Sequence, residues 1–284
     1  MRVIARPRLQ RVSTPAVARV EFERFARRGF RRPPFLCLIK DAHGLPRITC
    51  GAVRPGRILL YLHGGAYIGG SSQSHAGMLA RLSRLAAVEV CVPDYPLAPE
   101  QPFPAAFEGA LGAWEALLAQ GYRPRDIILG GDSAGGGLAL ALLSHLCLRG
   151  TPPAALFAMS PWTDLSMKGA SLTTNAARDP FLPIERMQEL IAYILPSGGD
   201  PADPRLSPLF GAFPDCPPVL LHYGETEILF DDSARMAAHL RAEGGAVSET
   251  VHPSAPHVWH LFDGWVPESR AALREIAGFV RAHL

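Results

Sequence analysis

Short apolar runs of strand length alternate with longer helix-like stretches along most of this sequence. The strand-like runs are residues 57–62, 88–92, 126–129, 154–159, 218–223 and 246–251. The helix-like stretches between them include residues 74–87, 104–120, 134–148 and 231–242. Strands that alternate with helices form mostly parallel sheets with helices on both faces, so the pattern predicts an α/β fold. The length of 284 residues favours one large domain over two.

Two segments do not follow this alternation. Residues 1–33 read as a helix, with Ser13 or Thr14 as the N-cap and Pro15 at the first helical position. Residues 171–199 contain a second helix-like run, 184–195, between prolines and glycines. We therefore predict that the two segments form a helical cap over the sheet edge of a single 1–284 domain.

Charge and cysteine content exclude several classes of protein. A net charge of +2 is too small for a protein whose main partner is nucleic acid. The first 32 residues hold ten arginines, but Glu21 and Glu23 interrupt them, which is not typical of a targeting peptide. No apolar stretch reaches the ~20 residues of a membrane span, so we expect no stable membrane insertion. The five cysteines form no CxxC pair, which favours a reducing cytoplasm.

The clearest chemical motif begins directly after the strand-like run 126–129. It reads Gly-Gly-Asp-Ser-Ala-Gly-Gly-Gly over residues 130–137, and Gly131 and Gly135 flank Ser133 in G-x-S-x-G spacing. A serine on so tight a strand-to-helix turn needs small neighbours, and the helix N-terminus directs N–H groups at any anion that forms there. An ordinary glycine-rich turn or a phosphate-binding loop would be the alternative.

A second glycine-rich loop, residues 63–70, follows the strand-like run 57–62. It reads His-Gly-Gly-Ala-Tyr-Ile-Gly-Gly. Acyl transfer from an ester passes through a tetrahedral oxyanion that needs preorganised donors. Since glycines allow close approach of the backbone, the N–H groups of Gly64, Gly65 and Ala134 are candidates for an oxyanion hole. The pairing of this loop with the downstream serine motif favours Ser133 as a nucleophile.

A nucleophilic serine also needs a base and an acid that orients it. The segment after residues 218–223 offers four candidate acids: Glu225, Glu227, Asp231 and Asp232. The two aspartates stand where a helix begins and would serve there as caps, whereas Glu227 lies in the loop.

Candidates for the base follow the last strand-like run. They are His252, His257 and His260. His257 comes after a turn from which it could reach back over the sheet edge. Three close histidines could instead bind zinc, but no H-E-x-x-H pattern or cysteine partner supports a metal site.

Together these segments resemble the bacterial hormone-sensitive-lipase-like (family IV) esterases, the H-G-G-G/G-D-S-A-G branch of the α/β-hydrolases. The resemblance extends from about His63 to Phe262. Within this range it rests on the segments 94–106, 160–165 and 257–259, in addition to the two glycine-rich motifs. It implies an α/β-hydrolase fold and a catalytic triad of Ser133, Glu227 and His257, with Gly64, Gly65 and Ala134 as the oxyanion hole and no metal or organic cofactor.

The sequence departs from the family pattern at three positions. Ala66 stands where the third glycine of the H-G-G-G motif is usual, Glu227 replaces the commoner aspartate, and Pro96 stands where arginine is frequent. The two remaining glycines leave the expected oxyanion hole intact, and a glutamate has a longer arm for the same role. An ion pair made by the usual arginine would be absent.

The resulting prediction is a serine carboxylesterase that hydrolyses short- to medium-chain esters through an acyl-enzyme. The expected substrate is a small uncharged ester in an apolar pocket, for which Phe181, Phe210, Trp162 and Trp259 are candidate lining residues. Alternatives are a lactonase, amidase or peptidase on the same fold, or a non-catalytic, receptor-like protein. The prediction leaves room for a homodimer.

Overall fold

An eight-stranded sheet forms the centre of the structure, a computed structural model that describes residues 14–284. The strand order is β1-β2-β4-β3-β5-β6-β7-β8; β1, β2 and β4 pair antiparallel and the remaining neighbours pair parallel. The strands are β1 Leu36–Lys40, β2 Pro46–Cys50, β3 Ile58–Leu62, β4 Glu89–Cys91, β5 Ile127–Asp132, β6 Ala155–Met159, β7 Val219–Gly224 and β8 Val247–His252. The predicted α/β fold with a mostly parallel sheet is confirmed.

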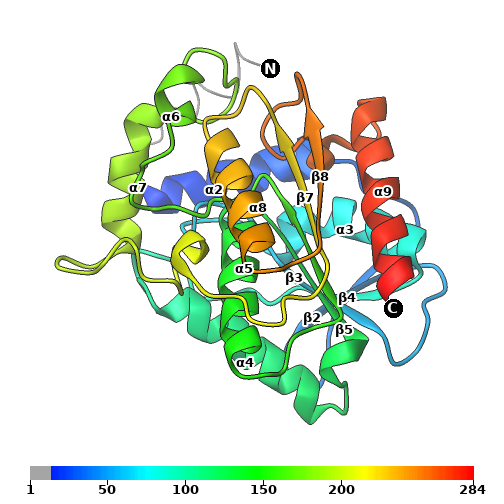
Figure 1. Cartoon of the computed structure of the whole chain (residues 1–284). Coiled ribbons are helices and arrows are strands. Elements are labelled where there is room, and N and C mark those ends of the chain that lie inside the picture. Colours follow the sequence, from blue (N-terminus) through cyan, green and yellow to red (C-terminus); the bar gives the residue numbers. More distant parts are fainter. Residues whose placement is uncertain (1–13) are drawn as a thin grey trace.

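Helices cover both faces of this sheet (Figure 1). The α-helices are α2 Pro15–Gly29, α3 Ser72–Ala86, α4 Ala105–Ala119, α5 Ser133–Leu148, α6 Ser171–Thr174, α7 Met187–Ile194, α8 Phe230–Ala242 and α9 Pro267–His283. Short 3-10 turns are η1 Pro124–Asp126, η2 Ile184–Arg186, η3 Pro208–Phe210 and η4 Trp259–Phe262. One buried cluster joins α4, α5 and α8 to the sheet, and another joins α3 and α9 to its opposite face.

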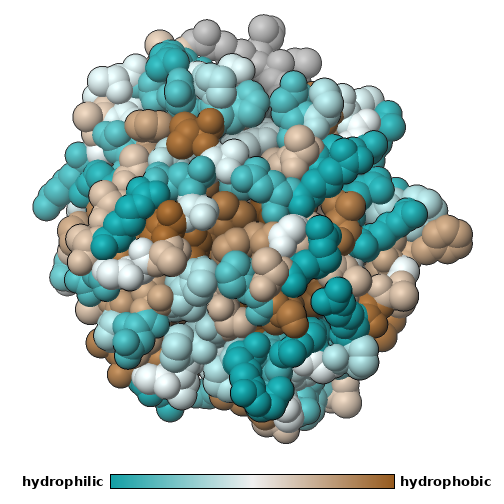
Figure 2. Space-filling view, turned by 45° about the vertical axis from the view of Figure 1, so that its right-hand side comes forward, coloured by the Kyte–Doolittle hydropathy of each residue, from teal (hydrophilic) through white to brown (hydrophobic). Residues whose placement is uncertain are grey.

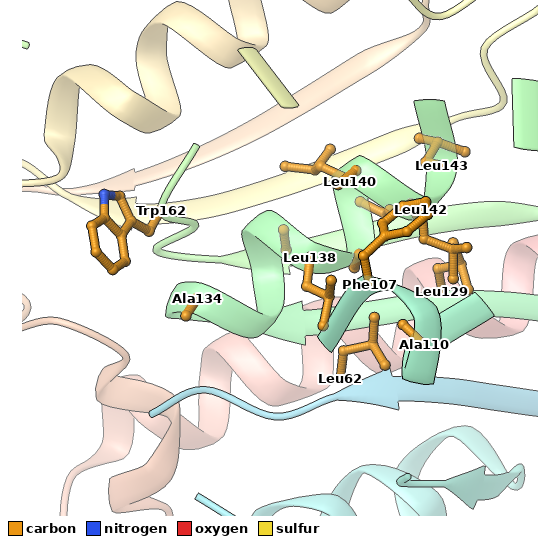
Figure 3. Close-up of a cluster of buried hydrophobic side chains, with 14 of the residues drawn as sticks. Leu62, Phe107, Ala110, Leu129, Ala134, Leu138, Leu140, Leu142, Leu143 and Trp162 are labelled. Carbon is orange, nitrogen blue, oxygen red and sulfur yellow. The ribbon is translucent and has the colours of Figure 1, made fainter. Parts of the chain in front are cut away.

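The strand and helix on either side of Ser133 are deeply buried. Every residue of β5 is buried, and α5 buries leucines all around its axis because it lies between the sheet and α4. Figure 3 shows side chains of α5 such as Leu138 and Leu142 packed with Phe107 of α4 and Leu62 of β3. This packing supplies a rigid base for the turn between β5 and α5.

The six predicted strands are present, with ends that differ from the prediction by a few residues at most. The hairpin of β1 and β2 was not among the predicted strands. It forms an antiparallel edge. Four of the five residues of β2 are buried, whereas no residue of β1 is. A half-exposed edge strand carries little of the apolar signal by which buried parallel strands are recognised.

The predicted N-terminal helix is α2. The Oγ1 atom of Thr14 accepts the N–H of Val17 at 3.3 Å, and Pro15 is the first helical residue. Ser13, the other candidate cap, and the first four arginines lie outside the described residues. The predicted run 184–195 forms η2 followed by α7.

Within residues 14–284, no helix is long and apolar enough to cross a membrane. Figure 2 shows one face of the molecule, on which hydrophilic residues are spread between smaller apolar areas. All five cysteines are unpaired, and Cys50, Cys91 and Cys147 are buried.

Candidate active site

Ser133 lies at the junction of β5 and α5, as the first residue of the helix. Its φ of 53° is in the left-handed region, which costs energy for any residue with a Cβ. The flanking glycines are sterically required: a Cβ on Gly131 would lie 2.3 Å from the carbonyl oxygen of Gly135, and one on Gly135 would lie 2.2 Å from that of Leu62. The turn therefore presents the Ser133 side chain at the N-terminus of α5.

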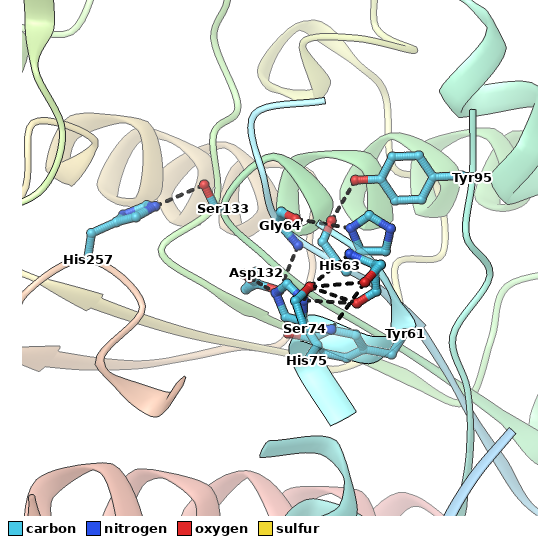
Figure 4. Close-up of polar contacts among 10 residues, drawn as sticks. Tyr61, His63, Gly64, Ser74, His75, Tyr95, Asp132, Ser133 and His257 are labelled. Atoms are coloured by element: carbon cyan, nitrogen blue, oxygen red, sulfur yellow. Dashed lines mark hydrogen bonds and ion pairs between the residues drawn. The ribbon is translucent and has the colours of Figure 1, made fainter. Parts of the chain in front are cut away.

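His257 reaches this serine from the loop after β8. Its Nε2 atom is 2.9 Å from Ser133 Oγ (Figure 4). The next residue, Val258, has a φ of 47°, and its N–H donates to Ser160 Oγ at 3.2 Å. The histidine loop is thus attached to the segment that follows β6.

Glu227 contacts the other side of the same imidazole. The Glu227 Oε2 atom is 2.6 Å from His257 Nδ1. Its Oε1 atom accepts the N–H of Gly224 at 2.6 Å and the hydroxyl of Ser160 at 2.8 Å. The carboxylate is fully buried, so both oxygens are held in place by hydrogen bonds.

The electrostatic consequence appears at His257. Burial by itself would lower the pKa of this imidazole, but the hydrogen bond to Glu227 and the charge of Glu227 outweigh it, so the pKa lies above its usual value. An imidazole in this position can accept the Ser133 proton and is stabilised when it carries the charge.

The other three candidate acids have different surroundings. Asp231 accepts the N–H of Ser171 at 2.9 Å, and Glu225 is exposed. Asp232 is buried and accepts two N–H groups of the segment after β6, and burial raises its pKa to about 7. Within residues 14–284, Glu227 is the one candidate whose carboxylate contacts His257.

The other two histidines do not join the site. His252 Nδ1 accepts the N–H groups of Ser254 and Ala255 at 3.2 and 2.9 Å. His260 is buried beside His222, with 3.1 Å between the ring nitrogens. The described part of the chain contains no group of three or more His, Cys, Asp or Glu side chains arranged to hold a metal ion.

The loop after β3 is held beneath Ser133 by Asp132. Asp132 Oδ1 accepts the N–H of Gly64 at 2.9 Å and the hydroxyl of Tyr61 at 2.6 Å. Asp132 Oδ2 is 3.3 Å from Nε2 of His75, a residue of α3 (Figure 4). The prediction that Gly64 donates to an oxyanion therefore needs correction, because a buried carboxylate already accepts its N–H.

The next two residues of the loop have available donors. The N–H groups of Gly65 and Ala66, like that of Ala134, donate to no atom of residues 14–284. Gly65 has a φ of 131° and Ala66 a φ of 54°, and a Cβ on Gly65 would lie 2.2 Å from the carbonyl oxygen of Gly69. The sequence analysis did not name Ala66 as a candidate donor, although it noted the residue as the departure from the H-G-G-G pattern.

Sequence reasoning also missed the role of Asp132. The only signal was its place directly before Ser133. A residue at the end of a buried strand must find partners for a buried carboxylate, but the sequence does not identify Tyr61 and His75 as those partners.

The four aromatic side chains predicted to line a pocket are dispersed. Trp162 is buried beside the serine turn, since its backbone N–H donates to the Ser133 carbonyl at 3.0 Å. Trp259 is buried against His222 and His260. Phe181 contacts Phe262, and Phe210 is exposed.

Helix α2 is attached to the loops around the site. The Arg19 guanidinium donates to the carbonyl oxygens of Ile68 and Ala98, both at 2.6 Å, and pairs with Glu100. Glu23 accepts the Ser71 hydroxyl at 2.6 Å.

The apolar side chains of α2 and of Phe30, the residue after it, do not form a single stripe. Phe22, Phe25 and Phe30 cluster with Phe262, whereas Val17 and Val20 are 42% and 55% exposed. The phenylalanines pack inward and the valines point toward solvent, since they lie on different sides of the helix.

Comparisons with known proteins identify the family and the class of enzyme. Residues 59–261 match the model of a family described by the alpha/beta hydrolase fold. An acetyl-hydrolase of Streptomyces hygroscopicus is 42% identical over 82% of this chain and 79% of its own length. An esterase of Acinetobacter venetianus is 38% identical over 78% of this chain and 74% of its own length. The crystal structure of an esterase from the bacterial hormone-sensitive lipase family superposes with a TM-score of 0.91 at 37% identity, over 95% of this chain and 92% of the other.

Proposed function

Because this chain belongs to the α/β-hydrolase family, and is a carboxylic-ester hydrolase of its hormone-sensitive-lipase-like branch, we propose that Ser133, His257 and Glu227 form its catalytic triad. The observation that carries the proposal is the hydrogen-bonded series Glu227–His257–Ser133, with 2.6 and 2.9 Å between successive partners. It ends on a serine held at a helix N-terminus.

The proposed reaction has two steps. His257 Nε2 takes the proton of Ser133 Oγ as this oxygen attacks the carbonyl carbon of the ester. The tetrahedral intermediate collapses to an acyl-enzyme when the protonated His257 gives its proton to the leaving alcohol. Water then attacks the acyl-enzyme with His257 again as the base, and Ser133 is restored as the acid product leaves. Throughout, Glu227 keeps the imidazole in one tautomer and stabilises its positive charge.

The proposed oxyanion hole consists of the N–H groups of Gly65, Ala66 and Ala134. Two observations support this proposal. None of the three N–H groups has an acceptor within residues 14–284, whereas the N–H of Gly64 already donates to Asp132. Three backbone donors at this position would stabilise the negative charge that develops on the carbonyl oxygen.

The proposed substrates are uncharged esters with short to medium acyl chains. The buried apolar residues around the serine turn, such as Leu138 and Trp162, favour neutral over charged acyl groups. The test is a panel of p-nitrophenyl esters of increasing chain length, measured beside lactones and anilides. Faster turnover of a lactone or an anilide than of every ester would contradict this proposal.

Covalent labelling provides a second test of the nucleophile. An organophosphate should modify the wild-type protein stoichiometrically at Ser133 and should leave Ser133→Ala unmodified. Ser133→Ala should also lose at least about a thousandfold in turnover. Absence of labelling in the wild type would instead favour a receptor-like protein.

The cap, the assembly and the compartment stay predictions. The contacts of Arg19 with Ile68 and Ala98 support a cap that includes α2. Deleting residues 1–30 should lower short-ester turnover or widen the chain-length preference, and unchanged kinetics of a folded truncation would contradict the cap.

Sedimentation analysis tests the homodimer. The unpaired state of all five cysteines supports our proposal of a reducing, cytoplasmic compartment.

A further inference from the structure

Residues 171–179 contain three buried polar side chains that the proposed reaction does not use. They are Ser171, Asn175 and Asp179, which are 3%, 5% and 0% exposed. The N–H of Asn175 donates to the Ser171 carbonyl at 2.9 Å, and the N–H of Asp179 donates to the Asn175 carbonyl at 2.8 Å. The segment therefore makes two successive helical turns, and these three residues, spaced four apart, lie on the same side of them.

Asn175 joins this segment to the loop that carries Glu227. We call residues 225–229, which lie between β7 and α8, the acid loop. The side-chain amide of Asn175 donates to the carbonyl oxygens of Glu225 and Glu227 at 3.0 and 2.8 Å. Its side-chain oxygen accepts a guanidinium N–H of Arg178 at 3.1 Å, which orients the amide N–H groups toward the loop. Asn175 therefore holds the backbone from which the Glu227 side chain extends.

Asp179 holds the next residue of the acid loop. Its Oδ2 atom accepts the N–H of Ile228 at 2.9 Å, and its Oδ1 atom accepts the N–H groups of Phe181 and Leu182 at 2.8 and 3.0 Å. The Ser171 hydroxyl donates to the Ile228 carbonyl at 2.7 Å. Because Ile228 is fully buried, its backbone groups need partners within the protein, and residues 171–179 supply them.

The charge of Asp179 also acts on the proposed general base. The titratable groups that act on His257 come from four elements: Glu227 of the acid loop, Asp179, Asp132 at the end of β5, and His260 of η4. Burial lowers the pKa of His257, the hydrogen bond and charge of Glu227 raise it, and the charges of Asp179 and Asp132 add to that rise. Burial holds the pKa of His260 well below its usual value, so this ring is neutral.

A buried carboxylate is unfavourable unless hydrogen bonds compensate its burial, as three backbone N–H groups do for Asp179. We propose that Asp179 is a positioning residue of the triad, which holds Glu227 against His257 through the acid loop and adds a buried negative charge that favours protonated His257. Asp179 acts through these two residues and is not itself catalytic. This inference rests on the proposed function. Because residues 171–199 belong to the predicted cap, the same contacts would connect the cap to the triad.

The experiment compares Asp179→Asn with Asp164→Asn in the hydrolysis of p-nitrophenyl butyrate. Asp164 is the matched control, since its carboxylate is also buried but pairs with Arg235 at 2.7 Å and is not among the groups that act on His257. Asp179→Asn should lower kcat about tenfold at an unchanged KM, because a displaced Glu227 stabilises the transition state less well.

The pH dependence of kcat/KM separates a positioning role from a structural one. Removing a negative charge near His257 makes its protonated form less stable, so the midpoint of the rise should move to lower pH in Asp179→Asn. In Asp164→Asn it should stay at the wild-type value, even if the Tm falls. An unchanged midpoint in Asp179→Asn, or an equal displacement in Asp164→Asn, would overturn the inference.

Proton NMR measures the same midpoint without reference to turnover. The proton between His257 Nδ1 and Glu227 Oε2, which are 2.6 Å apart, should give a low-field line that shifts as His257 gains its second proton. The titration of this line should move to lower pH in Asp179→Asn, in agreement with the kinetic midpoint. A titration identical to that of the wild type would contradict an action of Asp179 on His257.

A second variant decides the question if Asp179→Asn does not fold. Asn175→Ala removes the two hydrogen bonds to the acid loop without removing a charge, and it should lower kcat at an unchanged KM. Its control is Gln120→Ala, which removes an amide that contacts Arg47 and Asp41 away from the site and should keep the wild-type kcat. A wild-type kcat in Asn175→Ala would show that this segment does not position Glu227 and would overturn the inference.

Failure of the inference is distinguishable from failure of the proposed function. Titration with an organophosphate counts the reactive sites, so each kcat refers to folded protein. If the wild type hydrolysed no ester, or Ser133→Ala retained hydrolysis, the proposed function itself would fail. If Ser133→Ala is inactive but Asp179→Asn keeps the wild-type kcat and midpoint, only the role of Asp179 is overturned.

Discussion

Asp132 accepts the backbone N–H of Gly64 at 2.9 Å and so joins the residue before the nucleophile to the loop after β3. The same carboxylate accepts the Tyr61 hydroxyl and faces His75. Burial alone would lower the pKa of His75, but the charge of Asp132 outweighs it, and the pKa of His75 lies above its usual value. The serine turn and the proposed oxyanion loop are thereby held at a constant separation by one buried group.

Removing this carboxylate should damage both stability and turnover. Asp132→Ala leaves the Gly64 N–H, the Tyr61 hydroxyl and His75 without their shared partner, so we expect the free energy of unfolding to fall by at least about 3 kcal/mol. Misplacement of the loop should lower kcat about 100-fold. Tyr61→Phe removes one of the contacts and should cost about 2 kcal/mol. Urea unfolding and ester kinetics measure the two effects, and full turnover in Asp132→Ala would show that the loop keeps its position without this carboxylate.

The left-handed φ of Ser133 predicts a difference between two inactive variants. Ser133→Ala and Ser133→Gly both lack the hydroxyl, but only alanine keeps a Cβ at a φ of 53°. Ser133→Gly should therefore be the more stable of the two by about 1 kcal/mol. Equal free energies of unfolding in urea would show that the turn stores no such strain.

The orienting role of Glu227 is tested against a neighbouring carboxylate. Glu227→Gln should lower kcat by two orders of magnitude or more, because the amide cannot stabilise the His257 imidazolium as a carboxylate does. Asp231→Asn is the matched control. Asp231 is the second residue of α8, and its carboxylate accepts the N–H of Ser171, the first residue of α6, so this variant should lose only about 1 kcal/mol of stability. A comparable loss of kcat in Asp231→Asn would indicate that Asp231, and not Glu227, orients His257.

The raised pKa of His257 predicts the pH dependence of the reaction. A general base must be neutral, so kcat/KM should rise with pH through a midpoint above the usual histidine value of 6.5. Glu227→Gln removes the charge that raises this pKa, so the midpoint should move to lower pH while the maximum rate falls. The pH dependence of kcat/KM, measured for both proteins, tests this prediction. An identical midpoint would mean that the rise in kcat/KM reflects the titration of a group other than His257.

The architecture and the candidate residues of the site could be predicted from the sequence. Alternation of apolar runs with helix-like stretches predicted a mostly parallel sheet, because buried strands and amphipathic helices differ in period and length. The strand-to-helix turn at Ser133 could also be predicted from the sequence, because so tight a turn tolerates almost nothing but glycine at positions 131 and 135. Glu227 and His257 could be named as candidates from their places after the last two strands, helped by the family resemblance.

The contacts between individual atoms could be known only from the three-dimensional structure. Whether Gly64 or Ala66 offers a free N–H depends on Asp132, a residue 68 positions from Gly64 in the sequence. The division of α2 into packed phenylalanines and exposed valines depends on where Phe262 lies. That the Tyr67 hydroxyl has no hydrogen-bond partner within residues 14–284 could not be recognised until its surroundings were known. Hydrogen bonds of this kind require distances within a few tenths of an ångström between distant segments, and periodicity and spacing carry no such information.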